Sequence, residues 1–446
     1  MPLLTVNSLY RSLTTSSPCI LASRLTIGLS LAPAGKMTLS RHLSATFDTM
    51  ARLPYLSSRL QGFGTTIFAE MSALATKTGA LNLGQGFPDT DGPEEVSEAA
   101  IAAIRAGQNQ YPPGPGIADL REAVAEHQQR FWGVEVNPAD EVLVTAGATE
   151  ALAAAMLALC EVGDEVIAFD PTYDSYAAGI AMAGARLRTV VLRPTESELG
   201  STSFAFDRRE LEKAFSSKTR LLLLNSPHNP TGKVFSTEEL EFIAELCVRH
   251  DVIAVTDEVY EHLVFDGVHR PLCSFDGMAE RTLTISSGGK TFSFTGWKIG
   301  WAVGPREIVA AVRTAKQFLT FVSGAPFQPA IAAGLRLGDD YFEQFVATMA
   351  HKRDLLCPLL TEAGFDVIEP EGTYFATADI SPLGFDDGID FCLKLPELAG
   401  VVAVPSAVFY QDADDGAKLI RFCFAKNDAM LNEAGERLIK ALTPYR

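Results

Sequence analysis

The feature that most constrains the fold is a repeated alternation of short apolar segments with stretches of helical periodicity, which begins near Gly64. Helical periodicity covers, for example, residues 149–160 and 237–250. Strands that alternate with helices predict an α/β fold, in which a doubly wound, mostly parallel sheet is covered on both faces. The predicted buried strands are 141–145, 165–169, 187–192, 220–224, 252–256 and 282–286.

The pattern changes after about Gly338. A long helix through residue 360 is followed by short predicted strands and a closing helix at 430–442, which is typical of a smaller α+β domain. These strands are 374–378, 401–404 and 419–424. We therefore expect a large domain at 93–335 and a small domain at 336–446, which an N-terminal segment at 51–92 completes.

The first fifty residues differ from the rest of the chain. They hold fifteen Ser or Thr, four Lys or Arg and a single acidic residue, Asp48. This composition is typical of an organellar targeting peptide. We favour a leader translated from too early a start, with Met37 or Met50 as the true first residue, and a disordered tail is the third alternative. Residues 1–50 are therefore left out of the fold prediction.

Composition limits the partners. The chain carries 37 Lys and Arg against 55 Asp and Glu, which gives a net charge of −18. An acidic surface has nothing to pair with on nucleic acid or an anionic membrane, so we expect neither, and an anionic substrate must be bound by a few local cations. No apolar run reaches the about 18 residues of a membrane span. The seven cysteines are scattered without a C-x-x-C pair, so we predict no metal site and a cytoplasmic location.

Three predicted strands end in residues that can carry chemistry. Small residues at 146–150 open a helix, where backbone N–H groups can bind a phosphate. Asn229 lies in a turn rich in Asn and Pro, and Asp257 ends a strand three residues before Tyr260. Each pattern also has a purely structural interpretation: a tight connection, an ordinary turn and a helix N-cap, respectively.

The strand at 282–286 leads into a glycine pair followed by Lys290. A lysine on a mobile glycine hinge at a strand end is poorly placed for packing. It is well suited to an amine that forms and breaks a covalent bond with a carbonyl group. Lys298, eight residues later, supplies a second cation.

Taken in order, these motifs resemble those of class I/II aminotransferases, which are pyridoxal-phosphate enzymes of fold type I. The resemblance covers about residues 59–442 and is strongest to the branch with N-succinyldiaminopimelate, glutamine and kynurenine–oxoglutarate aminotransferases. The motifs are 82–88, 109–111, the turn at Gly147, 229–232, 257–260, Ser287-x-x-Lys290, Gly296-x-Lys298-x-Gly300 and Arg421.

The resemblance implies a cofactor, a set of site residues and a homodimer. Lys290 would bind pyridoxal 5′-phosphate covalently and move the Cα proton, while Asp257 would pair with the pyridine nitrogen and Arg421 with the substrate α-carboxylate. Tyr111 would reach the phosphate of the neighbouring subunit. The other implied cofactor-binding residues are Gly147, Ala148, Thr149, Tyr173, Asn229, Tyr260, Ser287 and Lys298, with Gly86 and Asn229 at the substrate. Tyr260 would share in catalysis by tuning the pKa of the nitrogen that links Lys290 to the cofactor.

The expected activity is transfer of an amino group to 2-oxoglutarate. The donor is predicted to be N-succinyldiaminopimelate, an intermediate of lysine biosynthesis, or an amino acid of the kynurenine or glutamine type. No second arginine for a dicarboxylate side chain is identifiable, which disfavours an aspartate aminotransferase. Two alternatives remain: a cysteine-conjugate β-lyase on the same scaffold, and a ligand sensor, which would need a basic winged helix that the leader does not supply.

Overall fold

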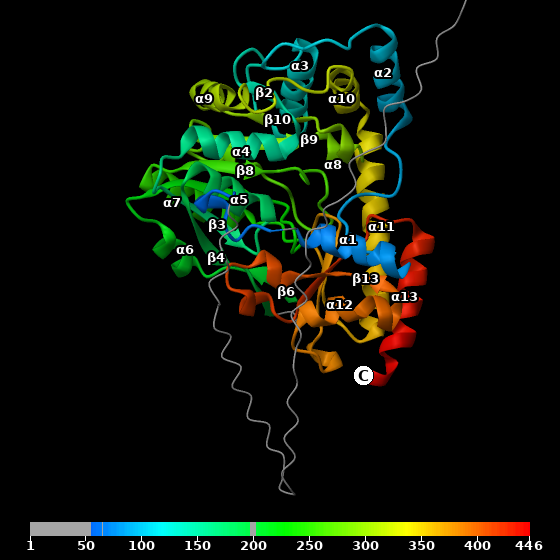
Figure 1. The fold of residues 1–446 in the computed structure, drawn as a ribbon. Coiled ribbons are helices and arrows are strands. Elements are labelled where there is room, and N and C mark those ends of the chain that lie inside the picture. The colour runs from blue at the N-terminus through cyan, green and yellow to red at the C-terminus, as the bar shows by residue number, and fades with distance from the viewer. Residues whose placement is uncertain (1–54, 65, 197–201) are drawn as a thin grey trace, which may run out of the picture. The chain divides into compact units, whose positions relative to one another are not determined.

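A seven-stranded sheet forms the centre of the larger part of the computed structural model, which describes residues 55–64, 66–196 and 202–446 (Figure 1). The strand order is β2-β10-β9-β8-β7-β3-β4, and only β10 runs antiparallel to its neighbours. Six of these strands were predicted to within one residue at each end, and β10 was not. Their bounds are β2 Val142–Thr145, β3 Glu165–Asp170, β4 Arg186–Val191, β7 Thr219–Asn225, β8 Ile253–Asp257, β9 Thr282–Ser287 and β10 Gly300–Val303.

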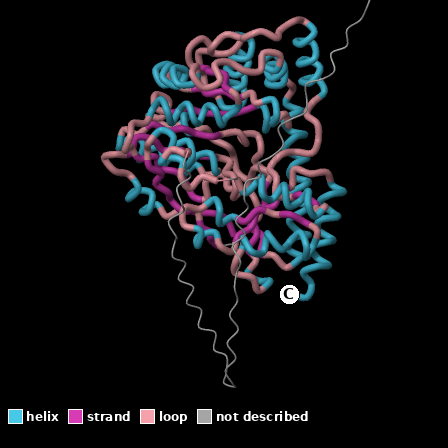
Figure 2. Tube along the Cα trace, in the orientation of Figure 1, coloured by secondary structure: helices cyan, strands magenta, loops and turns pink. Residues whose placement is uncertain are grey.

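Helices cover both faces of this sheet because successive strand side chains point to opposite sides. Leu143 of β2 packs under α4, α5 and α9, whereas Val142 and Val144 pack under α2, α3 and α10. Farther along the second face, α6 and α7 cover β7 and β3. The helices are α2 Glu94–Arg105, α3 Ala118–His127, α4 Gly147–Leu159, α5 Asp174–Ala183, α6 Arg208–Ala214, α7 Thr237–His250, α9 Arg306–Lys316 and α10 Phe327–Leu335. The α/β prediction is thus confirmed, and Figure 2 shows the strands enclosed by helices.

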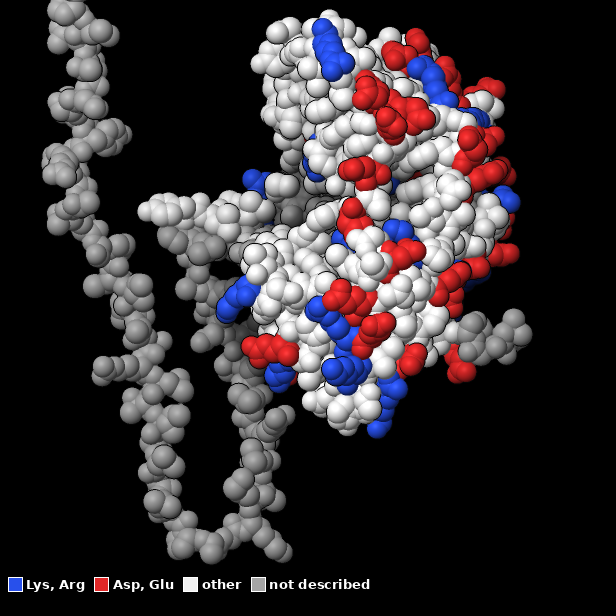
Figure 3. Space-filling view, turned by 90° about the vertical axis from the view of Figure 1, so that its right-hand side faces the viewer, with Lys and Arg blue, Asp and Glu red and all other residues white. Residues whose placement is uncertain are grey.

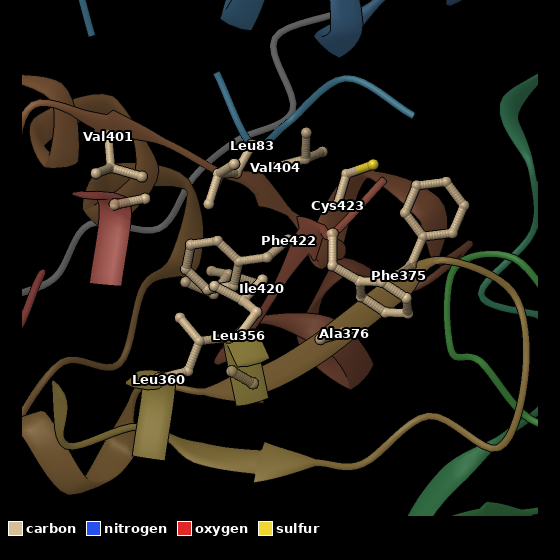
Figure 4. Close-up of a cluster of buried hydrophobic side chains, with 14 of the residues drawn as sticks. Leu83, Leu356, Leu360, Phe375, Ala376, Val401, Val404, Ile420, Phe422 and Cys423 are labelled. Carbon is tan, nitrogen blue, oxygen red and sulfur yellow. The ribbon is translucent and has the colours of Figure 1, made fainter. Parts of the chain in front are cut away.

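A second, antiparallel sheet lies in the C-terminal part, in the order β11-β12-β15-β14. Figure 4 shows its core, where Leu356 and Leu360 pack near Ile420 and Phe422. The elements are β11 Asp366–Ile368, β12 Phe375–Asp379, β14 Val404–Pro405, β15 Leu419–Cys423, α11 Asp339–Ala363, α12 Gly388–Ala399 and α13 Asp428–Leu442. The long α11 runs beside α13 (Figure 1). The predicted rhythm of long helix, short strands and closing helix is therefore observed.

One predicted strand, 401–404, is wrong as a single element. β13, Val401–Val402, pairs in parallel with β1, Leu81–Asn82, whereas β14 pairs with β15 of the antiparallel sheet. The chain thus changes partner at Ala403, and local hydrophobicity does not reveal which segment a strand pairs with. The consequence is that an N-terminal segment is bound to the C-terminal part.

That N-terminal segment begins with α1, Ile67–Thr78. The Thr66 side chain accepts a hydrogen bond from the backbone N–H of Ala69, and Gly79 ends the helix at φ 69°. Farther on, the backbone N–H of Cys423 donates to the Leu83 carbonyl at 2.7 Å, which fixes the segment that precedes Gly86. Pro93 is the N-cap residue of α2.

The predictions for residues 1–50 lie outside the described residues. Within the described part, no helix combines the length and the apolar character that crossing a membrane requires. Acidic side chains crowd one margin of the face shown in Figure 3, in keeping with the net charge of −18.

Candidate active site

A cavity of about 330 Å³ lies at the carboxyl ends of β7, β8 and β9, where a sheet of this topology is expected to bind ligands. The second sheet contributes Phe375 and Arg421, and the segment before α2 contributes Gln85, Gly86 and Phe87. Twelve residues predicted for the site line this cavity: Gly86, Gly147, Ala148, Thr149, Tyr173, Asn229, Asp257, Tyr260, Ser287, Lys290, Lys298 and Arg421.

Tyr111 is the predicted residue that lies elsewhere. Its side chain is 83% exposed and contacts Phe321 edge to face, with the ring centroids 5.6 Å apart. It does not line the cavity of its own chain.

Lys290 lies in a single helical turn, α8 Gly288–Thr291, directly after β9. Its Nζ is 3.0 Å from Tyr374 Oη, and burial lowers the pKa of the amine to about 8. The prediction of a mobile glycine hinge is not supported by the packing. A Cβ on Gly288 would lie 2.7 Å from Ile331 Cδ1, and one on Gly289 would lie 3.1 Å from Thr295 Cα. The glycines therefore permit close packing around the lysine.

Asp257 is the last residue of β8 and offers one free oxygen to the cavity. Tyr176 Oη donates to its Oδ2 at 2.6 Å, whereas Oδ1 is buried without a hydrogen-bond partner among the described residues. Burial raises the pKa of this carboxyl to about 6, although hydrogen bonds from Tyr176 and from the backbone N–H of Val259 oppose that shift. A buried carboxylate with an open acceptor is suited to a ligand that presents a charged N–H group.

Arg421, in the middle of β15, is 1% exposed and lines the opposite side of the cavity. Its Nη1 donates to Asn229 Oδ1 at 2.9 Å and its Nη2 donates to the Gly84 carbonyl at 3.1 Å. The guanidinium carbon lies 4.0 Å from the ring centroid of Phe375. Its buried Nε has no partner among the described residues, so part of the guanidinium is available to a carboxylate.

A short hydrogen-bond chain joins the two halves of the site. Asn225 Nδ2 donates to the carbonyl of Asp257 at 2.7 Å, and Asn225 Oδ1 accepts from the backbone N–H of Asn229 at 2.7 Å. Because Asn229 in turn holds Arg421, the end of β8 and the arginine of β15 are fixed relative to each other.

One end of the cavity fits an anion. Helix α4 begins here at Gly147, with φ 73°, and a Cβ at this residue would lie 3.5 Å from Lys298 Cε. Ser287 ends β9 beside it, and a Cβ on Gly300 would lie 2.7 Å from the carbonyl carbon of Gly147. A helix N-terminus, an amine and a hydroxyl together form a phosphate-type site.

At the other end, Gly86 lies against an aromatic ring. A Cβ on Gly86 would lie 2.6 Å from Phe375 Cζ, so no larger residue fits without displacing the ring. Tyr173 precedes α5 and contacts Tyr176 edge to face at 5.7 Å.

Sequence reasoning missed Tyr176, Asn225, Tyr374 and Phe375. Asn225 ends β7, but the pattern around it was taken as a turn. Tyr374 and Phe375 were placed in a predicted strand without a role. The signal in the sequence that could have identified such residues was a polar or aromatic residue next to the end of a predicted strand.

Behind Asp257, three buried groups come within 4.8 Å of one another: His127, Glu261 and His262. The two histidines share a hydrogen bond between their Nε2 atoms at 2.8 Å. Glu261 accepts from Trp132 Nε1 at 2.7 Å and from Ser286 Oγ at 2.6 Å. Both Glu261 oxygens and both Nε2 atoms are hydrogen-bonded, and His127 Nδ1 is buried without a partner among the described residues, so we interpret this cluster as a buried polar core.

The chain is similar in sequence to a known family and to named proteins. The family of class I and II aminotransferases matches residues 78–438. A Mycobacterium tuberculosis protein named as a probable N-succinyldiaminopimelate aminotransferase is 53% identical over 390 residues, which cover 85% of this chain and 97% of that protein. A kynurenine–oxoglutarate transaminase of Dictyostelium discoideum is 38% identical over 418 residues, with 86% and 96% covered.

A solved structure agrees with these matches. The structure of N-succinyldiaminopimelate aminotransferase from Mycobacterium tuberculosis superposes with a TM-score of 0.84 at 53% identity, and covers 86% of this chain and 100% of that one.

Replacing Asp257 by Asn should change how stability depends on pH. The pKa of Asp257 is raised in the folded protein. The protonated carboxyl therefore contributes fully to the free energy of unfolding of the wild type below about pH 4, and this contribution is lost as the pH rises through about 6. We expect the free energy of unfolding of Asp257→Asn, relative to wild type, to increase by about 3 kcal/mol from pH 4 to pH 7.

Urea unfolding of the ligand-free protein at several pH values measures this difference. The exposed Asp276→Asn is the control, and its difference from wild type should stay constant. A flat difference for Asp257→Asn as well would contradict the interpretation of a carboxylate held out of water.

Proposed function

Because this chain belongs to the class I and II aminotransferase family and is therefore a transaminase, we propose that it uses pyridoxal 5′-phosphate to move an amino group from N-succinyldiaminopimelate to 2-oxoglutarate. The observation that carries the cofactor is that Lys290, the open Oδ1 of Asp257 and the N-terminus of α4 line one cavity. The donor rests on the 53% identity over nearly the whole length of the mycobacterial relative.

The residues of the cavity fit pyridoxal phosphate. Asp257 Oδ1 would accept from the ring nitrogen, and it is the buried acceptor that lacks a partner. Tyr173 would cover the ring face, and Tyr260 and Asn229 would bind the ring oxygen. The phosphate would be held by the first amides of α4, Ser287 and Lys298. When bound, the cofactor supplies a conjugated ring that takes up the electron pair left by breakage of the Cα–H bond.

The chain's own residues supply binding and proton transfer. Lys290, with a pKa lowered to about 8, is partly neutral near pH 7 and can take the proton from Cα and return it. Arg421 would bind the substrate α-carboxylate, because a planar guanidinium matches a carboxylate with two parallel hydrogen bonds. Phe68 and Phe375 also line the cavity and exclude water around this pair.

The positively charged residues that line the cavity also suggest a role for a second subunit. Among the described residues, its Lys and Arg lining consists of Lys290, Lys298 and Arg421, each of which has a proposed role. A donor with further carboxylates would then meet a cation from the second subunit of a homodimer. The exposed Tyr111 supports such a dimer, in which it would reach the partner's phosphate site. A cytoplasmic location remains part of the proposal.

Amino-donor specificity is the direct test of this function. Purified protein loaded with pyridoxal phosphate should form glutamate from 2-oxoglutarate fastest with N-succinyldiaminopimelate, compared with kynurenine and glutamine.

Lys290→Ala should fold yet lose the visible absorbance of the bound cofactor and orders of magnitude of turnover, since one amine serves as anchor and proton carrier. Near-normal turnover in this variant would mean that the wrong lysine was chosen.

Ammonia and pyruvate formed from a cysteine conjugate without an oxo acid would instead reveal a β-lyase. The names of the compared relatives are those of transaminases, which does not favour that alternative.

Arg421→Lys should weaken every donor alike, because all donors share the α-carboxylate. Loss of a paired, desolvated contact costs on the order of 2–5 kcal/mol. We expect kcat/KM to fall by a similar factor for all three donors, with the cofactor absorbance unchanged. The matched control is Arg437→Lys on α13, a residue that does not line the cavity. A loss confined to one donor would mean that Arg421 binds a side chain.

The dimer can be tested by mixing two defective subunits. Lys290→Ala and Tyr111→Phe proteins, each inactive alone, should regain part of the activity when refolded together, since one of the two sites in a mixed dimer is intact. Activity assays before and after mixing measure this, with light scattering for the mass. A fully active monomer would contradict the shared site.

A further inference from the structure

Tyr374 makes a direct contact with the reactive amine that sequence motifs do not reveal. Its side chain is fully buried, and its Oη lies 3.0 Å from Lys290 Nζ and 2.9 Å from the carbonyl oxygen of Gly86. Lys290 Nζ itself lies 3.5 Å from the same carbonyl. Lysine amine, phenol and carbonyl thus form a closed triangle at the substrate end of the cavity.

The Gly86 carbonyl only accepts, so the O–H of Tyr374 donates to it, and the phenol oxygen accepts from Lys290. The Tyr260 phenol is a further hydrogen-bond partner of Tyr374. Burial raises the pKa of Tyr374 well above its usual value, so the phenol keeps its proton. A neutral amine has two N–H groups and one lone pair. The Tyr374 oxygen and the Gly86 carbonyl oxygen accept from these two N–H groups, so the lone pair is left to take the proton from the substrate Cα.

The backbone around Tyr374 holds it in this position at some cost. Thr373 has φ 67°, which is unfavourable for a β-branched residue. Its N–H donates to the Leu263 carbonyl at 2.9 Å, and its Oγ1 accepts from the N–H of Phe375 at 3.2 Å. The Tyr374 carbonyl accepts from the N–H of Phe424 at 3.0 Å. Segments on both sides therefore force the phenol toward Lys290.

We propose that Tyr374 is a positioning residue of the transamination reaction, which holds the free amine of Lys290 so that its lone pair faces the substrate Cα. The inference rests on the proposed function of Lys290. In the step concerned, the Cα–H bond breaks, its proton forms an N–H bond at Nζ, and its electron pair remains on the substrate side. Tyr374 gains and loses no proton, and it limits the rotation of a four-carbon side chain that would otherwise leave the amine unaimed.

Tyr374→Phe removes the phenol oxygen and keeps the ring. Tyr341→Phe is the matched control, because Tyr341 Oη donates to the carbonyl of Thr291, the neighbour of Lys290, without touching Nζ. The other titratable groups that act on the amine are the same in both variants, namely Cys423, Asp257, Arg421 and Lys298. Circular dichroism and cofactor absorbance check that both proteins are folded and loaded.

The first measurement uses the cofactor-free protein. Pulse acetylation across a pH range, with the Lys290 peptide quantified by mass spectrometry, reports the pKa of its amine. Since the phenol oxygen stabilises the ammonium form, Tyr374→Phe should lower this pKa by about one unit, whereas Tyr341→Phe should leave it unchanged. An unchanged pKa in Tyr374→Phe would overturn the inference.

The second measurement uses the loaded enzyme with a donor deuterated at Cα. We expect Tyr374→Phe to lower kcat about 10- to 100-fold with KM nearly constant, and to raise the deuterium isotope effect, because proton transfer becomes slower than the other steps. Equal loss in Tyr341→Phe, or an isotope effect that stays at the wild-type value, would overturn it. A wild type inactive with every donor would contradict the proposed function instead, and the acetylation result would still decide on Tyr374.

Discussion

The buried guanidinium of Arg421 is the group on which the arrangement of the two sheets depends. Moving a charge out of water costs several kcal/mol unless partners compensate, so a buried arginine requires a fixed set of contacts. Here those contacts come from the turn after β7 through Asn229, from the N-terminal segment through Gly84, and from β12 through Phe375. Segments far apart in sequence must meet for the charge to be satisfied. The meeting point is the cavity, where the Nε–H of the guanidinium and one N–H on each Nη remain outside these hydrogen bonds.

The end of β8 shows how one segment serves both the cavity and the core. Asp257 and Tyr260 line the cavity, whereas Glu258 and Glu261 enter a buried polar layer on the other side, where Glu258 Oε2 is 2.8 Å from His269 Nε2. Burial raises the pKa of Glu261 to about 7. Buried titratable groups thus flank the strand end on both sides, and the hydrogen-bonded layer supports the carboxyl group that faces the cavity.

Much of the fold was predictable because strands buried on both faces are continuous apolar runs bounded by turns. β10 was missed because Gly300–Val303 is short and follows a motif that drew attention to its glycines. In the site, residues that follow strands were found, since topology brings the ends of parallel strands together. Tyr176, Asn225 and Tyr374 were missed because their importance lies in hydrogen bonds to distant segments. The packing role of Gly288 was missed for the same reason: Ile331, which requires the glycine, is far away in sequence.

Two neighbouring residues illustrate what such distant contacts accomplish. Tyr374 contacts the lysine and Phe375 contacts the arginine, although side chains that alternate along a strand usually serve opposite faces. Tyr374 precedes β12 and is not part of it, so this alternation does not govern the pair: Phe375 lines the cavity, whereas Tyr374 reaches Lys290 Nζ from outside the cavity lining. Gly86 lies against both, with its carbonyl on the phenol of Tyr374 and its α-carbon against the ring of Phe375. A displacement of this one glycine would therefore disturb the surroundings of Lys290 and Arg421 together. In the proposed function these two residues transfer the proton and bind the carboxylate, so the single short segment would couple substrate binding to chemistry.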